Sequence, residues 1–216
     1  MTAVESGSTC VVIFARAPRP GTVKTRLIPL LGPQGAAALH ARMVKRALAT
    51  ARNAALGSVE LHCAPDCEDD FLRFCGNRYR ADLIAQVEGD LGTRMAAAAR
   101  MALAVHARVL LMGSDCPALT ARHLRAANQA LLDGAAAALA PTEDGGYALL
   151  GLRHSDQRLF DGIAWGRETV LADTRARLRE LAWRWHELDT LWDIDRPEDY
   201  QRLVESRLLD EHPATR

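Results

Sequence analysis

Arg16, Lys24 and Arg26 lie within one short loop of the sequence, Phe14–Leu27 (FARAPRPGTVKTRL). Guanidinium and ammonium groups are suited to bind phosphate oxygens, and Gly21 allows a ligand to approach the backbone of this loop closely. The loop matches neither the Walker A pattern nor the G-x-G-x-x-G dinucleotide pattern. We expect it to bind the phosphates of a nucleotide. The alternatives are a solvated basic loop and, for Arg26, an ion pair with a local carboxylate that pins the loop.

Two aspartates occur in turns where a hard cation could be held: Asp115 in GSDCPAL and Asp195 in DIDRPED. Mg²⁺ usually takes one or two protein carboxylates and completes its octahedron with phosphate oxygens and water. We therefore expect Asp115 and Asp195 to share one Mg²⁺ (or Mn²⁺) ion, with Asp193 as the alternative second ligand. Capping of a turn or of a helix is the structural alternative for these aspartates.

Two glycine-containing loops complete the set of candidate segments. Glu143–Tyr147 (EDGGY) combines two carboxylates, two glycines and an aromatic ring, although D-G and G-G are also common hairpin dipeptides. Glu88–Met95 (EGDLGTRM) opens a predicted helix, whose first backbone N–H groups could bind a base, a ribose or a phosphate. An ordinary strand-to-helix loop is the alternative for this second segment.

Strand-like apolar runs alternate with helix-like segments and would position these loops. Strands are predicted at 10–15, 59–63, 83–87, 109–112, 136–140, 147–152 and near 184–188, and helices at 35–55, 93–106, 120–132, 167–181 and from Pro197 onwards. Such alternation predicts a mostly parallel α/β sheet with helices on both faces. Ligands bind beyond the carboxyl ends of the strands in such sheets, where the loops above are expected.

Composition narrows the class of protein. The chain has 216 residues, and its 27 basic and 27 acidic side chains give no net field that would hold a nucleic acid or a membrane. We find no apolar run long enough to span a bilayer and no signal-peptide pattern, so we expect one cytoplasmic domain over residues 1–216. Five cysteines are an odd number, and the spacing of Cys63, Cys67 and Cys75 is not that of a zinc site.

Six motifs in order resemble the DUF2064 family, also called rSAM/selenodomain-associated transferase 1, which is related to 2-phospholactate guanylyltransferases. They are FARAPRPGTVKTRL, GDLGTRM, GSDCPALT, PTEDGGYALLGL, W-x3-TVLADT and DIDRPED, between Val11 and Leu203. The resemblance implies a Rossmann-like three-layer α/β/α sandwich of the nucleotide-diphospho-sugar transferase (GT-A) type. The family often has Trp-Ser-Thr where this chain has Trp165-Gly166-Arg167, so the acceptor side is expected to differ.

The resemblance also implies roles for individual residues. Asp115 and Asp195 would be the first and second metal aspartates, and Lys24, Arg26 and Asp115 the catalytic residues. The nucleotide would be bound by Ala15, Arg16, Gly21, Lys24, Arg26, Gly89, Asp90, Gly92 and Arg94, and the acceptor by Asp144, Gly145, Gly146, Tyr147 and Trp165.

These observations predict a metal-dependent transferase that moves a nucleotidyl group from a nucleoside triphosphate to a small phosphorylated or sugar-like acceptor. Lys24 and Arg26 favour a triphosphate donor, and Asp115 lacks the D-x-D pattern of many glycosyltransferases. Glycosyl transfer from a nucleotide-sugar and a nucleotide-binding module without turnover are the alternatives. The base and the acceptor cannot be read from the sequence, and a homodimer is one option for the oligomeric state.

Overall fold

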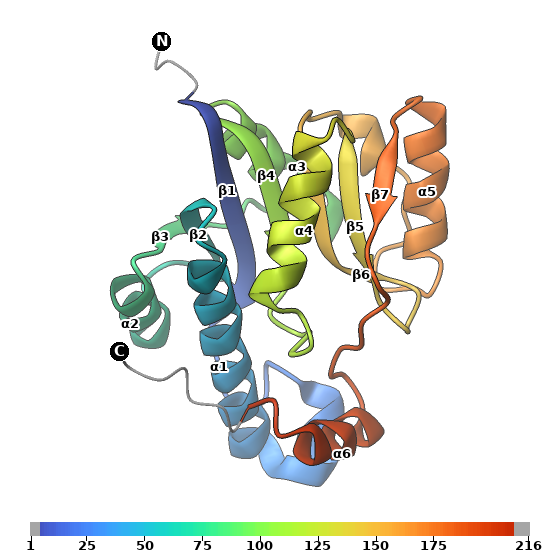
Figure 1. Ribbon diagram of the computed structural model, residues 1–216. Helices are drawn as coiled ribbons and strands as arrows, with labels where there is room; N and C mark the ends of the chain where they lie inside the picture. The colour runs from blue at the N-terminus through green and yellow to red at the C-terminus, as the bar shows by residue number, and fades with distance from the viewer. Residues whose placement is uncertain (1–4, 210–216) are drawn as a thin grey trace.

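The computed structural model describes residues 5–209 and shows a seven-stranded sheet between two layers of helices (Figure 1). The strands are β1 (Glu5–Arg16), β2 (Gly57–Ala64), β3 (Asp82–Ala85), β4 (His106–Met112), β5 (Ala137–Pro141), β6 (Tyr147–Leu152) and β7 (Trp185–Glu187). Their spatial order is β3-β2-β1-β4-β6-β5-β7, and β6 runs antiparallel to both of its neighbours while the other pairs are parallel. The predicted mostly parallel sheet is therefore confirmed.

Six α-helices cover the two faces of the sheet and its carboxyl edge. They are α1 (Ile28–Ala54), α2 (Asp70–Tyr79), α3 (Leu91–Leu103), α4 (Ala121–Leu132), α5 (Val170–Glu180) and α6 (Pro197–Ser206). One core cluster joins the sheet to α1, α2 and α4, and a second joins the opposite face to α3 and α5. Figure 1 shows α1 and α4 in front of the sheet and α3 behind it.

β1 illustrates why the central strands read as unbroken apolar runs. Val11 and Ile13 pack into the first core cluster, whereas Cys10 and Val12 pack into the second. Successive side chains of a strand point to opposite faces, so a strand with helices on both sides must be apolar at every position. All four side chains are fully buried, and the strand order places β1 beside the central strand β4.

Two helices differ from the sequence-based expectation. The first helix begins at Ile28 rather than at residue 35, because it continues across a kink at Gly32, whose φ of 68° is not helical, followed by Pro33. Glycine and proline at these positions masked the helical pattern on either side. No element was expected at residues 70–79, where α2 forms behind an N-cap in which the side chain of Asp69 accepts from the Phe71 N–H.

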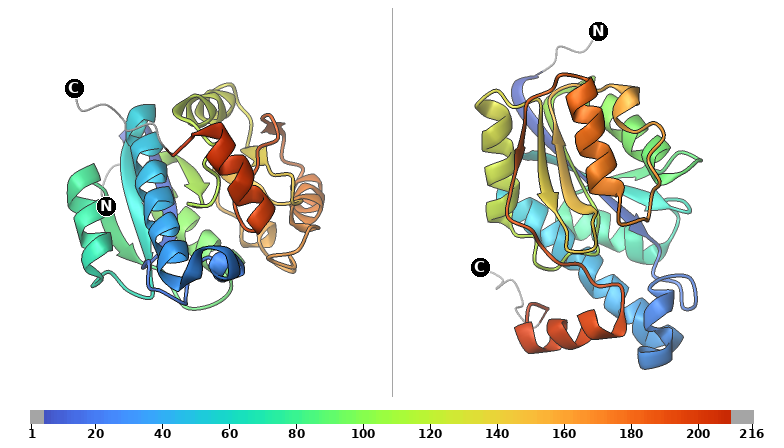
Figure 2. Two further views of the ribbon diagram at one scale, coloured as in Figure 1. Left: turned by 90° about the horizontal axis from the view of Figure 1, so that it is seen from below. Right: turned by 90° about the vertical axis from the view of Figure 1, so that its right-hand side faces the viewer.

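A third core cluster fixes the C-terminal segment beneath the carboxyl edge. Leu203 of α6 and the buried Ile194 pack with Leu27, Leu39 and Met43 at the start of the chain's first helical region. Figure 2 shows α6 lying across this end of the molecule, beside the early part of α1. Within residues 5–209, no helix has the length and apolar character needed to cross a membrane.

Candidate active site

A cavity of about 340 Å³ opens at the carboxyl edge of the sheet. Segments far apart in the sequence border it. The lining includes the acidic residues Asp115, Asp144, Asp193 and Asp195, the basic residues Lys24 and Arg167, and the apolar residues Phe14, Leu91, Met95, Leu111, Met112, Trp165 and Val170. It thus combines an apolar floor with a few charged groups, which is typical of small-molecule sites.

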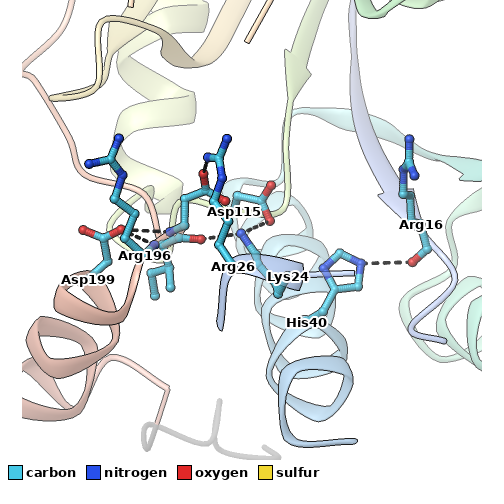
Figure 3. Close-up of polar contacts among 9 residues, drawn as sticks. Arg16, Lys24, Arg26, His40, Asp115, Arg196 and Asp199 are labelled. Carbon is cyan, nitrogen blue, oxygen red and sulfur yellow. Dashed lines mark hydrogen bonds and ion pairs between the residues drawn. The ribbon is translucent and has the colours of Figure 1, made fainter. Parts of the chain in front are cut away.

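Lys24 is held at the centre of this edge by contacts with two other segments. Its Nζ lies 2.8 Å from Asp115 Oδ1 and also donates a hydrogen bond to the carbonyl oxygen of Ile194 (Figure 3). The Lys24 side chain is only 5% exposed. Its backbone has φ 47° and ψ 43°, a left-handed conformation that is uncommon for a residue other than glycine. Such a strained backbone persists only where the surrounding contacts hold it in place, and strained residues are concentrated at functional sites.

Charge pairing keeps the Asp115 carboxylate ionised. Desolvation opposes ionisation, although the side chain is about half exposed, and the charge and hydrogen bond of Lys24 hold the pKa of Asp115 below its usual value. His40 lies behind this pair, and its Nε2 contacts the Arg16 carbonyl oxygen at 3.0 Å. Burial lowers the pKa of His40 although the charge of Asp115 raises it, so this imidazole is neutral near pH 7.

Backbone bonds bring the C-terminal aspartates to Asp115. The Ile194 N–H donates to the Asp115 carbonyl oxygen at 3.0 Å, which places the flanking Asp193 and Asp195 beside the turn after β4. The carboxylate of Asp195 pairs with Nη1 of Arg26. Both predicted metal aspartates therefore border one cavity, and each is paired with a cation from the first loop.

Asp193, the alternative second ligand, also borders the cavity and has a perturbed pKa. Burial and the neighbouring charge of Asp144 raise the pKa of Asp193 to about 6, and Asp115 adds to this effect. Clustered carboxylates of this kind repel one another and gain from a shared cation. The structure thus keeps both Asp193 and Asp195 as candidate partners of Asp115.

The EDGGY segment forms a tight hairpin between β5 and β6. Asp144 Oδ1 accepts hydrogen bonds from the Thr142 hydroxyl at 2.6 Å and from the Gly146 N–H at 3.0 Å. Asp144, Gly146 and Tyr147 border the cavity, but the Tyr147 hydroxyl is buried away from solvent. Any contact of Tyr147 with a ligand in the cavity is therefore made by other atoms of the residue.

The segment before α5 is fixed against two glycines. A Cβ added at Gly145 would overlap the carbonyl oxygen of Glu168, and the Leu171 N–H donates to the Gly145 carbonyl oxygen at 2.9 Å. A Cβ at Gly92 would overlap the Trp165 indole. Both glycines were predicted site residues, and neither borders the cavity. In the structure each allows close packing of the segment that carries Trp165.

Several predicted nucleotide-binding residues do not border the cavity. They are Ala15, Arg16, Gly21, Arg26, Gly89, Asp90, Gly92 and Arg94. In Figure 3 the Arg16 guanidinium lies apart from the Lys24–Asp115 pair, beyond His40. Arg26 forms the ion pair that was its structural alternative, although with a carboxylate distant in sequence.

Two residues at the start of α3 have structural contacts. Asp90 caps the helix, because its Oδ1 accepts from the Thr93 N–H at 2.8 Å. Arg94 donates to Gln86 Oε1 at 3.4 Å, and Gln86 in turn donates to the Ala15 carbonyl oxygen. Their binding roles stay predictions.

Sequence reasoning missed the apolar floor and Arg167. Leu111 lies in a predicted buried strand and was expected only as a core residue, whereas Phe14 was expected as the first residue of the basic loop, with no role of its own. Leu91 and Met95 are one helical turn apart on α3, a spacing that also fits ordinary core packing. The Trp-Gly-Arg departure from the family pattern was the available signal for Arg167.

A second group of metal-ligand side chains lies away from the cavity, near the amino ends of β2 and β4. Ligand atoms of Cys10, Glu60 and His106 all lie within 4.8 Å of one another and could hold a metal ion. The two His106 ring nitrogens contact the hydroxyls of Ser8 at 2.9 Å and Ser58 at 3.1 Å. Burial raises the pKa of the Cys10 thiol to about 12. The described side chains thus form a polar network across three strands.

Solved structures share this fold. A protein of Desulfovibrio desulfuricans G20, provisionally named a nucleotide-diphospho-sugar transferase, is 30% identical with a TM-score of 0.83 over 92% of this chain and 87% of its own. A nucleotidyl transferase of Methanothermobacter thermautotrophicus is 14% identical with a TM-score of 0.66 over 94% and 99%. Rv0371c of Mycobacterium tuberculosis H37Rv, complexed with manganese, is 17% identical with a TM-score of 0.59 over 92% and 99%. No curated protein matches the chain.

These neighbours and the sheet between two layers of helices define the class of protein. The chain has the nucleotide-diphospho-sugar transferase fold of GT-A type, as expected. The profile of the DUF2064 family, described as an uncharacterized protein conserved in bacteria, matches residues 33–167. The chain belongs to the DUF2064 family, and the resemblance found from its motifs is confirmed.

Proposed function

We propose that this protein is a nucleotidyltransferase that uses a nucleoside triphosphate and a divalent cation. The observation that carries the proposal is the contact between Lys24 and Asp115 at the mouth of the cavity. It joins a basic loop suited to phosphates to a carboxylate suited to a hard cation, at the sheet edge where such folds bind ligands. The names of two solved neighbours, a nucleotidyl transferase and a protein complexed with manganese, agree with this assignment.

The donor set fits Mg²⁺ or Mn²⁺. Asp115, with Asp195 or Asp193, would hold the ion through hard carboxylate oxygens. When bound, the ion would neutralise phosphate charge and polarise the reacting phosphoryl group. Lys24 would neutralise a phosphate oxygen from the other side, which requires its ammonium to exchange contacts with Asp115.

The proposed reaction is an in-line displacement at the α-phosphorus. An oxygen of the acceptor forms a bond to this phosphorus while the bond to the bridging oxygen of the β-phosphate breaks, and pyrophosphate leaves with the electron pair. Trp165, Tyr147 and Gly146 border the part of the cavity proposed for the acceptor. Their role is to hold the acceptor in position and to limit water, which would otherwise compete as the attacking group.

Glycosyl transfer from a nucleotide-sugar is the second candidate, because the neighbour at 30% identity carries the name of a nucleotide-diphospho-sugar transferase. The test is a thermal-shift panel of nucleoside triphosphates and nucleotide-sugars with and without Mg²⁺, followed by calorimetry. We expect the tightest binding from one triphosphate with metal, and its loss in Asp115→Asn but not in Asp82→Asn, which changes an exposed aspartate of β3. Preference for a nucleotide-sugar would select the second candidate. Binding of neither class would refute both.

A further inference from the structure

Arg167 is the one basic residue of the cavity lining, within the described part of the chain, that has no ion pair or hydrogen bond from its side chain. The other basic residue, Lys24, is engaged by Asp115 and by the Ile194 carbonyl. A guanidinium group offers five donors in a planar fork that matches a carboxylate or a phosphate. An anion bound in the cavity would supply a charged partner for the Arg167 guanidinium, and the described part of the protein supplies none.

The segment that carries Arg167 is held in place rather than loosely attached. Its backbone N–H donates to the Ala164 carbonyl at 3.2 Å, and its carbonyl oxygen accepts from the Val170 N–H at 3.2 Å. The neighbouring Glu168 lies against Gly145 of the hairpin. Arg167 is therefore presented from a fixed position, which lowers the entropy cost of binding a ligand.

Arg167 belongs to a different segment from the loop proposed for the donor phosphates. Lys24 follows β1, whereas Arg167 precedes α5 and borders the same cavity together with Trp165 and Gly146, the residues proposed for the acceptor. The lining also includes the apolar residue Val170 and the carboxylate of Asp144, and in the described chain it holds no basic group besides Arg167 and Lys24. Arg167 is exposed, and a neutral sugar would offer its guanidinium no charge-assisted hydrogen bond, whereas an anionic group of the acceptor would.

We propose that Arg167 binds an anionic group of the acceptor, so that the acceptor is a small molecule with a carboxylate or phosphate rather than a neutral sugar. This inference rests on the proposed function, because only a transferase has an acceptor. The anion-binding site itself is defined by Arg167 and the cavity. Arg167 is then a specificity residue, and its departure from the Trp-Ser-Thr pattern corresponds to a change in the acceptor that is bound.

The experiment compares wild type, Arg167→Gln and Arg167→Lys with Arg153→Gln, an exposed arginine outside the cavity. Calorimetry with Mg²⁺ uses three probes: 3-phosphoglycerate, inorganic phosphate and neutral glycerol. Each is measured alone and with the α,β-methylene analogue of the triphosphate that binds best. We expect 3-phosphoglycerate to bind wild type and Arg153→Gln alike, Arg167→Gln to bind it about 10- to 100-fold more weakly, and Arg167→Lys to fall between.

The affinity for the triphosphate analogue separates this inference from the proposed function. We expect it to stay within about twofold in Arg167→Gln, because one charge-assisted bond to a phosphate would be worth considerably more. An equal loss of triphosphate affinity would assign Arg167 to the donor and overturn the proposal. So would anionic probes that bind wild type no better than glycerol, or that bind Arg167→Gln unchanged. If the anion binds through Arg167 but no triphosphate binds, the anion site stands and the proposed function fails.

Discussion

Lys24 and Asp115 follow different strands, β1 and β4, and their side chains meet 2.8 Å apart at the edge of the sheet. Lys24 has a left-handed backbone at this point, and its ammonium also donates to the Ile194 carbonyl. Three segments separated by long stretches of sequence are thereby locked together. The same pair joins the two functions proposed for this edge, phosphate binding and metal binding.

The backbone strain at Lys24 predicts an unusual ranking of two variants. Lys24→Ala and Lys24→Gly both remove the ammonium group, but only glycine adopts a φ of 47° without steric cost. We expect Lys24→Gly to be more stable than Lys24→Ala by about 1 kcal/mol, or roughly 2–4 °C in Tm, in calorimetric or urea unfolding. An alanine variant as stable as the glycine variant would show that this residue does not need the left-handed region.

Charge competition at Asp115 predicts opposite effects on two ligands. The Lys24 ammonium at 2.8 Å repels a metal ion that approaches the same carboxylate, yet it attracts the phosphates of a nucleotide. Lys24→Met should therefore bind Mn²⁺ alone more tightly, by about threefold to tenfold, and the triphosphate more weakly, by about 10- to 100-fold. Electron paramagnetic resonance titration of Mn²⁺ and calorimetry measure the two affinities.

The matched control for this charge effect is Arg52→Met, which removes an exposed cation at the far end of α1. It should change neither affinity. A Lys24→Met variant that weakens both ligands together would indicate that Lys24 acts mainly by keeping the loop folded.

The sequence predicted the sheet better than the contacts at its edge. The buried apolar run of β1 and the glycine-rich turns can be read locally, because their causes lie within a few residues. The pair between Arg26 and Asp195 cannot, because it depends on how α6 packs beneath the edge. The apolar part of the cavity lining was missed for a related reason, since Leu111 belongs to a buried strand and shows the same pattern as a core residue.

The raised pKa of Asp193 predicts a pH-dependent gain in stability for Asp193→Asn. Burial and the charge of Asp144 raise this pKa to about 6 in the folded protein, whereas an unfolded aspartate has a pKa of about 3.9. The folded state therefore binds the proton more tightly, and its stability falls as the pH rises from about 4 to 6. Above pH 6 both states are ionised and the full cost of the buried charge remains.

Asparagine removes that cost, so the variant should be more stable than wild type by about 1–2 kcal/mol at pH 7.5, with a smaller difference at pH 5. Urea unfolding at several pH values without divalent cations measures this. Asp161→Asn, which changes an exposed aspartate before α5, should show no such trend. A variant that loses stability at pH 7.5 would mean that the Asp193 carboxylate makes a favourable contact that outweighs its burial.

The contact between the hairpin and the segment before α5 predicts the consequence of a single added methyl group. Gly145 and Gly21 have nearly equal φ values of 85° and 83°, so alanine at either position carries a similar backbone strain of about 1 kcal/mol. They differ in their surroundings, because a Cβ at Gly145 would overlap the carbonyl oxygen of Glu168, whereas a Cβ at Gly21 has no atom within 4 Å. Gly145→Ala should therefore lower Tm several degrees more than Gly21→Ala, and it should displace the segment that holds Arg167. Binding of 3-phosphoglycerate should fall in Gly145→Ala and not in Gly21→Ala. Equal losses of stability in the two variants, with unchanged binding of this probe, would mean that the hairpin does not position Arg167.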